Sequence, residues 1–122
     1  MTLFENLLMA HLAGDWIFQT EWQALNKTRS WRALLAHVSA YHLLVLGILL
    51  SRFGLAEPRV YLAVALLAVS HALLDRRDPL IWLMRKLRIV VEREPPFWLV
   101  MAVDQSVHIL LLGLVAIQLT AL

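Results

Sequence analysis

The 122-residue sequence contains no cysteine. Disulfide bonds, thiolate zinc sites, iron–sulfur clusters, covalently attached c-type haem and cysteine nucleophiles are therefore excluded. The first five residues lack the basic stretch that opens a secretory signal peptide, so we expect the first apolar segment to be retained. The formal net charge is only +2, and no basic face of a soluble fold is apparent. We therefore expect no nucleic-acid partner.

Apolar residues are abundant instead. They make up 61% of the chain, whereas globular domains contain about 45–50%, and the mean hydropathy is +0.70. We predict one all-α domain over residues 1–122, an integral membrane four-helix bundle in contact with membrane lipids. Its four spans are of roughly the length that a bilayer requires, over residues 3–22, 31–50, 59–75 and 97–122. A polar turn over residues 26–30, with Ser30 as N-cap of the second helix, separates the first two spans.

Residues 79–94, between the third and fourth spans, predict a short amphipathic helix. Apolar residues recur at helical spacing and basic residues fill most other positions. We expect this helix to lie in the cytoplasmic membrane interface with Trp82 as an anchor. The alternative is a helix that packs on the protein's own loops.

The basic residues indicate an orientation. Nine of the eleven lie in the two loops after spans one and three, and only Arg52 and Arg59 lie on the other side. Because cytoplasmic loops are enriched in Lys and Arg, we expect those two loops to be cytoplasmic and both termini to lie outside.

Pairs of acid and imidazole side chains lie inside the apolar segments. Each pair is separated by four positions, which places both side chains on one face of a helix. The pairs are His11 with Asp15, His71 with Asp75, and Asp104 with His108. A carboxylate near the bilayer interior is costly unless it is paired, neutralised or bound to a cation.

Helix direction places all three pairs toward the cytoplasmic side, where His37 of the second span joins them. We predict that this set holds one or two divalent metal ions, with zinc, manganese or iron preferred by mixed His and Asp ligation. The predicted ligands are His11, Asp15, His37, His71, Asp75, Asp104 and His108. The alternatives are a structural polar network or proton relay, and a different cofactor.

Other residues have predicted supporting roles. Gln19 and Gln105 would orient the ligands by hydrogen bonds. Tyr41 follows His37 by one turn and could donate a proton. Arg76 and Arg77 directly follow Asp75, where they could bind an anionic headgroup or a substrate phosphate or simply set the topology.

His42 is treated separately. It lies about 140° around the helix from His37, so the two cannot share a face. His42 is then either a hydrogen-bonded packing residue or, with His108, one of two axial ligands of a haem.

These motifs resemble an uncharacterised bacterial family of small four-span membrane proteins, known only as a domain of unknown function. The resemblance rests on H-x3-D-x3-Q at residues 11–19, Lys27 in the first loop, H-x3-Y at 37–41, H-x3-D at 71–75 and D-Q-x2-H at 104–108. It covers most of the chain, supports the same site residues and implies the bacterial inner membrane, but it implies no activity. Where the family usually has a lysine after the third-span Asp, this chain has Arg76 and Arg77.

The leading hypothesis is a metal-dependent hydrolase that acts on an amphiphilic or lipid-like substrate entering from the cytoplasmic leaflet. Asp15 or Asp104 would serve as general base beside a metal-bound water. The alternatives are a transporter or channel subunit for metal ions or protons, a haem-binding electron carrier, and a non-catalytic membrane subunit. A homo-oligomer is compatible with each of them.

Overall fold

The computed structural model describes residues 1–91 and 93–121. These residues form helices and contain no strand, which confirms the predicted all-α class. The elements are α1 (Leu3–Leu12), the π-helical turn η1 (Ala13–Ile17), α2 (Glu21–Asn26), α3 (Trp31–Phe53), α4 (Pro58–Asp75), α5 (Asp78–Lys86) and α6 (Phe97–Thr120).

Local sequence signals explain most helix ends. Ser30 caps α3 as predicted, because its side chain accepts a hydrogen bond from the backbone N–H of Ala33. Gly54 ends α3 at a φ of 83°, a conformation that glycine adopts without strain. Pro58 then opens α4, where its missing N–H is not needed. Glu57 caps α4, and the hydrogen bond from the Arg59 side chain lowers the pKa of Glu57 to about 2.

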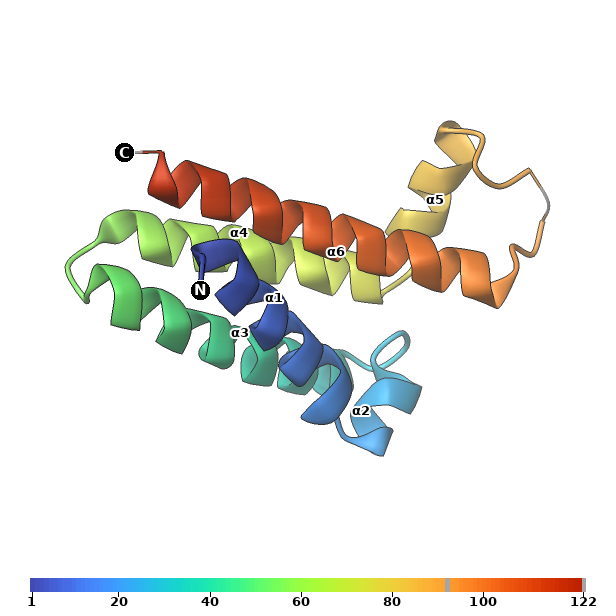
Figure 1. The fold of residues 1–122 in the computed structure, drawn as a ribbon. Helices are drawn as coiled ribbons and strands as arrows, with labels where there is room; N and C mark the ends of the chain where they lie inside the picture. Colours follow the sequence, from blue (N-terminus) through green and yellow to red (C-terminus); the bar gives the residue numbers. More distant parts are fainter. Residues whose placement is uncertain (92, 122) are drawn as a thin grey trace.

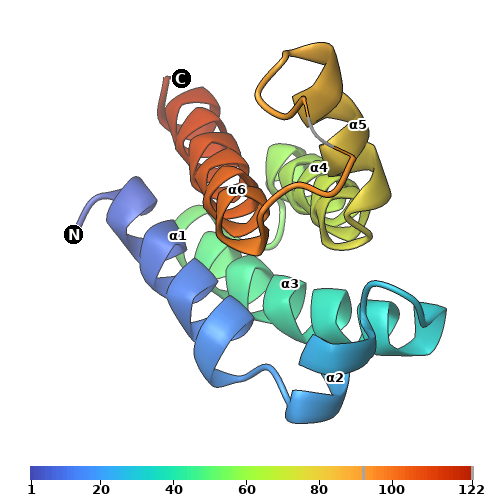
Figure 2. The ribbon, with the colours of Figure 1, turned by 90° about the vertical axis from the view of Figure 1, so that its right-hand side faces the viewer.

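Four helices pack in a ring. Helix α1 contacts α3 and α6, and α4 contacts the same two helices. Figure 1 shows α3, α4 and α6 running side by side with α1 crossing α3, and Figure 2 looks onto the ring from the end that carries α2 and α5. Both termini and the α3–α4 connection lie at the opposite end (Figure 1).

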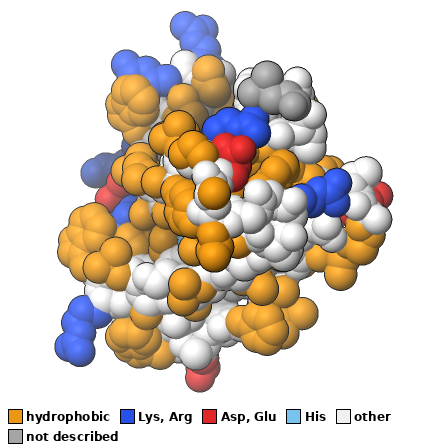
Figure 3. Space-filling view, turned by 90° about the vertical axis from the view of Figure 1, so that its left-hand side faces the viewer, with side chains coloured by type: hydrophobic (Ala, Val, Ile, Leu, Met, Phe, Trp, Pro, Cys, Tyr) orange, Lys and Arg blue, Asp and Glu red, His pale blue; other side chains and the backbone are white. Residues whose placement is uncertain are grey.

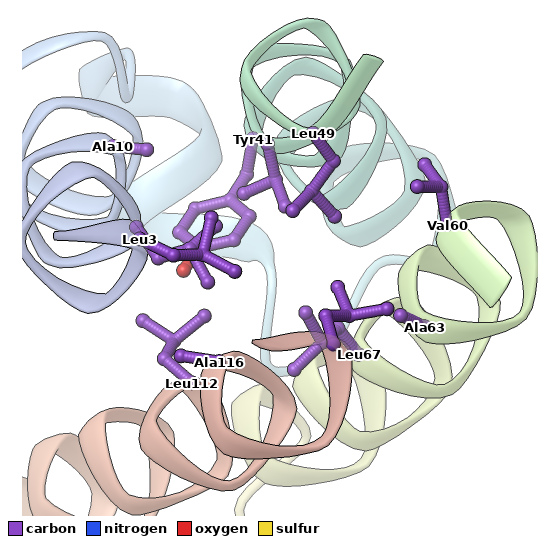
Figure 4. Close-up of a cluster of buried hydrophobic side chains, with 12 residues drawn as sticks. Leu3, Ala10, Tyr41, Leu49, Val60, Ala63, Leu67, Leu112 and Ala116 are labelled. Carbon is purple, nitrogen blue, oxygen red and sulfur yellow. The ribbon is translucent and has the colours of Figure 1, made fainter. Parts of the chain in front are cut away.

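The end of the ring near the termini has a hydrophobic core. All four helices contribute side chains that point toward its centre, among them Leu3, Leu49, Leu67 and Leu112 (Figure 4). Such side chains hold helices together by close van der Waals packing, in lipid as well as in water. The core therefore fixes the four helices relative to one another and so positions the polar residues farther along them.

Three of the helices are long and apolar enough to cross a membrane: α3, α4 and α6. Their outward faces expose large apolar side chains such as Leu43, Leu66 and Leu114. At the end near the termini, hydrophobic side chains cover much of the surface, with a few charged side chains scattered between them (Figure 3). The structure thus supports a membrane protein.

The predicted first span over residues 3–22 has a different form. Continuous helix runs only from Leu3 to Ile17, which is about 22 Å at 1.5 Å per residue. The chain then bends, because the Thr20 side chain and Gln23 form a capping box that starts the separate helix α2. The other predicted spans match α3, α4 and α6 within a few residues, and the predicted end at Leu122 lies outside the described residues.

Helix α5 is shorter than the predicted helix over residues 79–94. It ends at Lys86, and Arg88 has a φ of 58°, which is incompatible with a continuing helix. Leu80 and Met84 pack mainly against residues of the helices α4 and α6, whereas the alternative to the interfacial helix names the protein's own loops, and Trp82 remains exposed. Placement in the membrane interface stays a prediction, and Glu92 of the predicted helix lies outside the described residues.

Candidate metal centre

The polar residues gather at one end of the ring. All five histidines of the chain are buried, as are Asp15, Asp75 and Asp104. They come from the C-terminal parts of α1–η1 and α4 and from the first half of α3 and of α6, which meet at the end beside α2 and α5 (Figure 1). The structure thus places the predicted ligands at a common depth along the four helices.

Four residues form the tightest group: Asp15, His37, His71 and Asp75. His37 Nε2 lies 2.9 Å from Asp15 Oδ1, 3.2 Å from Asp75 Oδ2 and 3.2 Å from His71 Nε2. His71 Nε2 in turn lies 3.4 Å from Asp15 Oδ1 and 3.1 Å from Asp75 Oδ2. Two imidazole nitrogens and two carboxylate oxygens therefore converge on one point from three elements of the ring.

Ordinary hydrogen bonding does not account for this convergence. A single N–H on His37 Nε2 cannot point at three acceptors at once. Asp75 Oδ2 has nitrogen atoms within ion-pair distance, yet none of them meets hydrogen-bond geometry among the described residues. Ligand atoms around a tetrahedral zinc ion with bonds of about 2.0–2.1 Å are roughly 3.3 Å apart. The observed separations of 2.9 to 3.4 Å are close to that value, so this group could hold a metal ion.

A second group shares Asp75 and adds Asp104 and His108. His108 donates its Nδ1–H to the Asp104 carbonyl oxygen over 2.8 Å, which leaves a lone pair on Nε2. His108 Nε2 and Asp104 Oδ1 are both buried without a hydrogen-bond partner in the described part of the chain. These free acceptor atoms are chemically suited to a second cation beside the first group.

His11 lies outside both groups. Tyr41 donates its hydroxyl to His11 Nδ1 over 3.0 Å, and His11 Nε2–H donates to Gln105 Oε1 over 2.9 Å. The Gln105 amide then donates to Asp15 Oδ2 and to Asp104 Oδ2, each over 3.1 Å. This chain links one carboxylate of each group and fixes its orientation, the role that the sequence predicts for Gln105.

The π-helical turn sets the position of Asp15. The Phe18 N–H bonds to the Ala13 carbonyl oxygen five residues back over 2.8 Å, a widening that is frequent at functional sites. Gly14 lies against the Tyr41 ring, and a Cβ atom at Gly14 would meet Tyr41 Cδ2 at 2.8 Å. The glycine thus permits the close approach of η1 to α3 that brings Asp15 to His37.

Lys27 is the site residue that ligand spacing did not identify. Its Nζ lies 3.1 Å from Asp75 Oδ2, and its side chain is largely buried. It approaches the cluster because α2 folds back against α3. The only signal in the sequence was its place in the family motif, since as a loop lysine it fits equally well with the positive charge expected of a cytoplasmic loop.

A pocket of about 190 Å³ adjoins both groups. It is lined by Asp15, Trp16, Gln19, Ala24, Lys27, Leu74, Asp75, Arg77, Phe97, Met101, Asp104 and Gln105. Gln19 donates to the Asp15 backbone carbonyl oxygen over 3.2 Å and so supports the π-helical turn. Charged and apolar side chains share this wall, which suits an amphiphilic ligand.

Arg76 and Arg77, the two arginines predicted to bind an anion, lie in different surroundings. Arg77 lines the pocket, with its guanidinium 5.1 Å from the centre of the Phe97 ring. Arg76 instead stacks on Trp31 at 4.5 Å, away from the pocket lining. Only Arg77 is thus placed to meet a ligand beside the cluster.

His42 belongs to neither group. Its Nδ1–H donates to the Val38 carbonyl oxygen over 2.8 Å, and its ring packs against Tyr41 and His71. The cavity that it lines with His108 measures about 10 Å³, the space of about one water molecule. His42 is therefore a packing residue in contact with His71.

Comparison with curated proteins and with solved structures finds no match. A family comparison does match and covers nearly the whole chain, over residues 3–122. The match confirms the expected membership of a family of unknown function, and it carries no activity. The chain belongs to the family described as "Protein of unknown function (DUF3307)".

Proposed function

We propose that this protein is a metal-dependent hydrolase of the bacterial inner membrane that acts on an amphiphilic substrate at the cytoplasmic leaflet. The observation that carries the proposal is the convergence of Asp15, His37, His71 and Asp75 at separations close to those of tetrahedral metal ligands. In this proposal α1–η1 is a fourth, shorter membrane-embedded helix beside α3, α4 and α6. The basic loops and α5 lie on the cytoplasmic side, so the pocket opens toward that leaflet.

One divalent ion would bind in the first group. A second would be held by Asp75, Asp104 and His108, so Asp75 would contribute to both groups, as carboxylates do in helical di-metal sites. Imidazole and carboxylate ligands without sulfur favour zinc, manganese or iron. The role of His11 in this arrangement is to hold Gln105, which in turn holds Asp15 and Asp104.

A bound divalent ion supplies a water of lowered pKa and polarises the oxygen of an ester group. When only the first group holds an ion, Asp104 is the residue best placed to accept the proton of that water, because it lines the pocket and its Oδ1 has no hydrogen-bond partner among the described residues. Tyr41 is held by His11 and does not line the pocket, so we assign it a positioning role.

Transport and haem binding are less well supported. A transport path would continue through the ring toward the termini, where Leu7, Val45, Leu49 and Leu112 are fully or almost fully buried in an apolar core. A haem between His42 and His108 would have to fit where the cavity measures about 10 Å³. Hydrolysis at the pocket requires neither a path through the ring nor a cavity the size of a haem, so it agrees with both observations.

The test is metal analysis followed by a hydrolysis assay. Protein purified in detergent from metal-replete cells should contain one or two divalent ions per chain by mass spectrometry. Chelation should abolish hydrolysis of amphiphilic esters, and the ion found in the native protein should restore it. Metal-free protein that takes up no ion would refute the proposal, and a metal-loaded protein without activity on any ester would refute its hydrolytic part.

A further inference from the structure

We infer that the substrate of this site carries a phosphate ester group on a hydrocarbon chain, and that Lys27 and Arg77 recognise the phosphate. This inference rests on the proposed metal-dependent hydrolase and names the class of its substrate. It follows from the charges, the spare hydrogen-bond donors and the apolar wall of the 190 Å³ pocket.

The charges of the pocket lining favour an anion once a metal is bound. Three carboxylates and two cationic side chains, Lys27 and Arg77, line the pocket, which leaves one net negative charge. One divalent ion changes this sum to +1, and two change it to +3. Because uncompensated charge is costly beside a membrane interior, a negatively charged substrate group is favoured over a neutral ester.

Lys27 is suited to be one of the two recognising groups. Its ammonium group carries three N–H donors, and its one ion-pair contact among the described residues is with Asp75 Oδ2 at 3.1 Å. That oxygen is the one that also contacts His37 and His71, so a metal ion in the first group would take over its negative charge. The Lys27 ammonium would then be available to a phosphate oxygen in the pocket.

Arg77 is the second group. It lies at the α4–α5 junction with a φ of 65°, and its guanidinium lies against Phe97, whereas that of Arg76 lies against Trp31. Its guanidinium has five N–H donors, yet the side-chain hydrogen bond found for it is a weak one, from Nη2 to the sulfur of Met101 at 3.6 Å. A guanidinium with unused donors beside a metal centre is suited to bidentate contact with phosphate.

The rest of the wall fits a hydrocarbon chain. Trp16, Leu74, Phe97 and Met101 line the pocket, and Trp16 and Phe97 are also largely exposed on the outer surface. An apolar path thus leads from the charged end of the pocket to the part of the surface that would face lipid. A phosphate at the metal centre could therefore keep its hydrocarbon chain in the bilayer.

The reaction is the hydrolysis of a phosphate monoester. The water oxygen attacks phosphorus, the bond between phosphorus and the ester oxygen breaks, and the alcohol leaves with a proton. Asp104 accepts the proton of the attacking water and returns one to the leaving oxygen. The products are an alcohol of low polarity and inorganic phosphate, and no oxidant or further reactant is required.

The experiment compares dodecyl phosphate, dodecyl acetate and phenyl phosphate on metal-loaded full-length protein in detergent. Lys27→Gln and Arg77→Gln are tested beside two matched controls, Arg29→Gln in the same loop as Lys27 and Arg76→Gln next to Arg77. Release of inorganic phosphate or acetate, binding by calorimetry and metal content are measured for each variant.

We expect release of phosphate from dodecyl phosphate. Lys27→Gln and Arg77→Gln should each raise KM and weaken dodecyl phosphate binding at least tenfold with metal content unchanged, while both controls behave as the wild type. Phenyl phosphate should bind at least tenfold more weakly than dodecyl phosphate, because it lacks the chain.

Three results would overturn the inference. Cleavage of dodecyl acetate, with no binding of dodecyl phosphate, would reject the phosphate but leave the metal-dependent hydrolase standing. Equal binding of dodecyl phosphate to the wild type, Lys27→Gln and Arg77→Gln would show that these two residues do not recognise the phosphate, whether or not metal is present. Equal binding of dodecyl phosphate and phenyl phosphate would show that the pocket does not recognise the hydrocarbon chain. If the proposed metal-dependent hydrolase is itself wrong, the wild-type protein will contain no bound metal, which the measurement of metal content detects separately.

Discussion

The two ends of the four-helix ring share their backbone architecture and differ in what fills them. Toward the termini, the inward positions of the four helices are apolar, for example Leu7, Val45 and Leu112. One turn farther along the same faces, the inward positions are His11, Tyr41 and His108. The change occurs at the same depth on every helix, although neighbouring helices run in opposite directions (Figure 1).

The two ends of the ring therefore have different roles: one end stabilises the fold and the other holds the candidate metal ligands. The apolar end holds the helices together by packing, and the polar end places charged groups where they are costly. Helix packing alone does not require five histidines and three aspartates to be buried at one level. Paired substitutions, one at each end of the same helix, should therefore have different effects.

The largest difference is expected within α4. His71→Ala removes the imidazole that contacts His37, Asp15 and Asp75, so metal affinity should fall at least about a hundredfold, more than the loss typical of a residue that only supports a ligand. Leu67→Ala, one turn nearer the apolar end, should lower stability by about 2–3 kcal/mol and keep the metal. Metal content and thermal unfolding are measured for both variants. Loss of metal from both would show that the apolar end and the polar end do not act independently.

A smaller difference is expected within α6. Gln105→Met breaks the hydrogen bonds that orient Asp15 and Asp104, and metal affinity should fall about 10–100-fold. Gln118→Met changes an exposed residue near the other end of the same helix and should leave affinity unchanged. Competition titration with a chelator measures both, and unchanged affinity in Gln105→Met would argue against the positioning chain.

Two glycines provide a third comparison. Gly14→Ala would place a Cβ atom 2.8 Å from the Tyr41 ring, so the variant should lose about 1–3 kcal/mol of stability by overpacking. Gly47→Ala meets no described atom within 4 Å, and its better helix propensity should leave stability equal or slightly higher. Chemical unfolding in detergent measures both effects. Equal stability of the two variants would contradict the close packing of η1 on α3.

The smallest effect concerns the end of the molecule far from the metal centre. The pKa of Glu57 is lowered to about 2 by its hydrogen bond from Arg59, from an ordinary value of 4.5. The carboxylate therefore stabilises the folded state above about pH 4.5, and this contribution is lost as the pH falls toward 2. The Tm of Glu57→Gln should be slightly below that of the wild type at neutral pH, and the gap should narrow on acidification. A gap independent of pH would contradict the ion pair.

The sequence was most informative where periodicity and composition act together. Helices α3, α4 and α6 were predicted nearly at their observed ends, because long apolar runs and Pro or Ser at the starts leave few alternatives. The i, i+4 pairs, combined with helix direction, also predicted a shared depth for the polar residues. The first segment was less predictable, since its apolar content hides the π-helical turn and the capping box that ends it.

Contacts between helices were beyond the reach of spacing alone. Nothing in the i, i+4 pattern distinguishes His11, whose two nitrogens are occupied by Tyr41 and Gln105, from His71, whose Nε2 faces the cluster. The approach of Lys27 to Asp75 depends on the way α2 folds back on α3. Both details depend on the rotation of each helix about its axis, which is set by packing.

The most direct test of the metal centre is X-ray absorption spectroscopy of the purified protein, together with metal quantification. We predict at least one divalent ion per chain, bound by two imidazole nitrogens and by oxygen ligands at about 2.0–2.2 Å. In His71→Ala the number of imidazole nitrogens per bound ion, or the metal content itself, should fall. A protein that binds no divalent ion, or an ion whose spectrum contains no imidazole, would contradict the account.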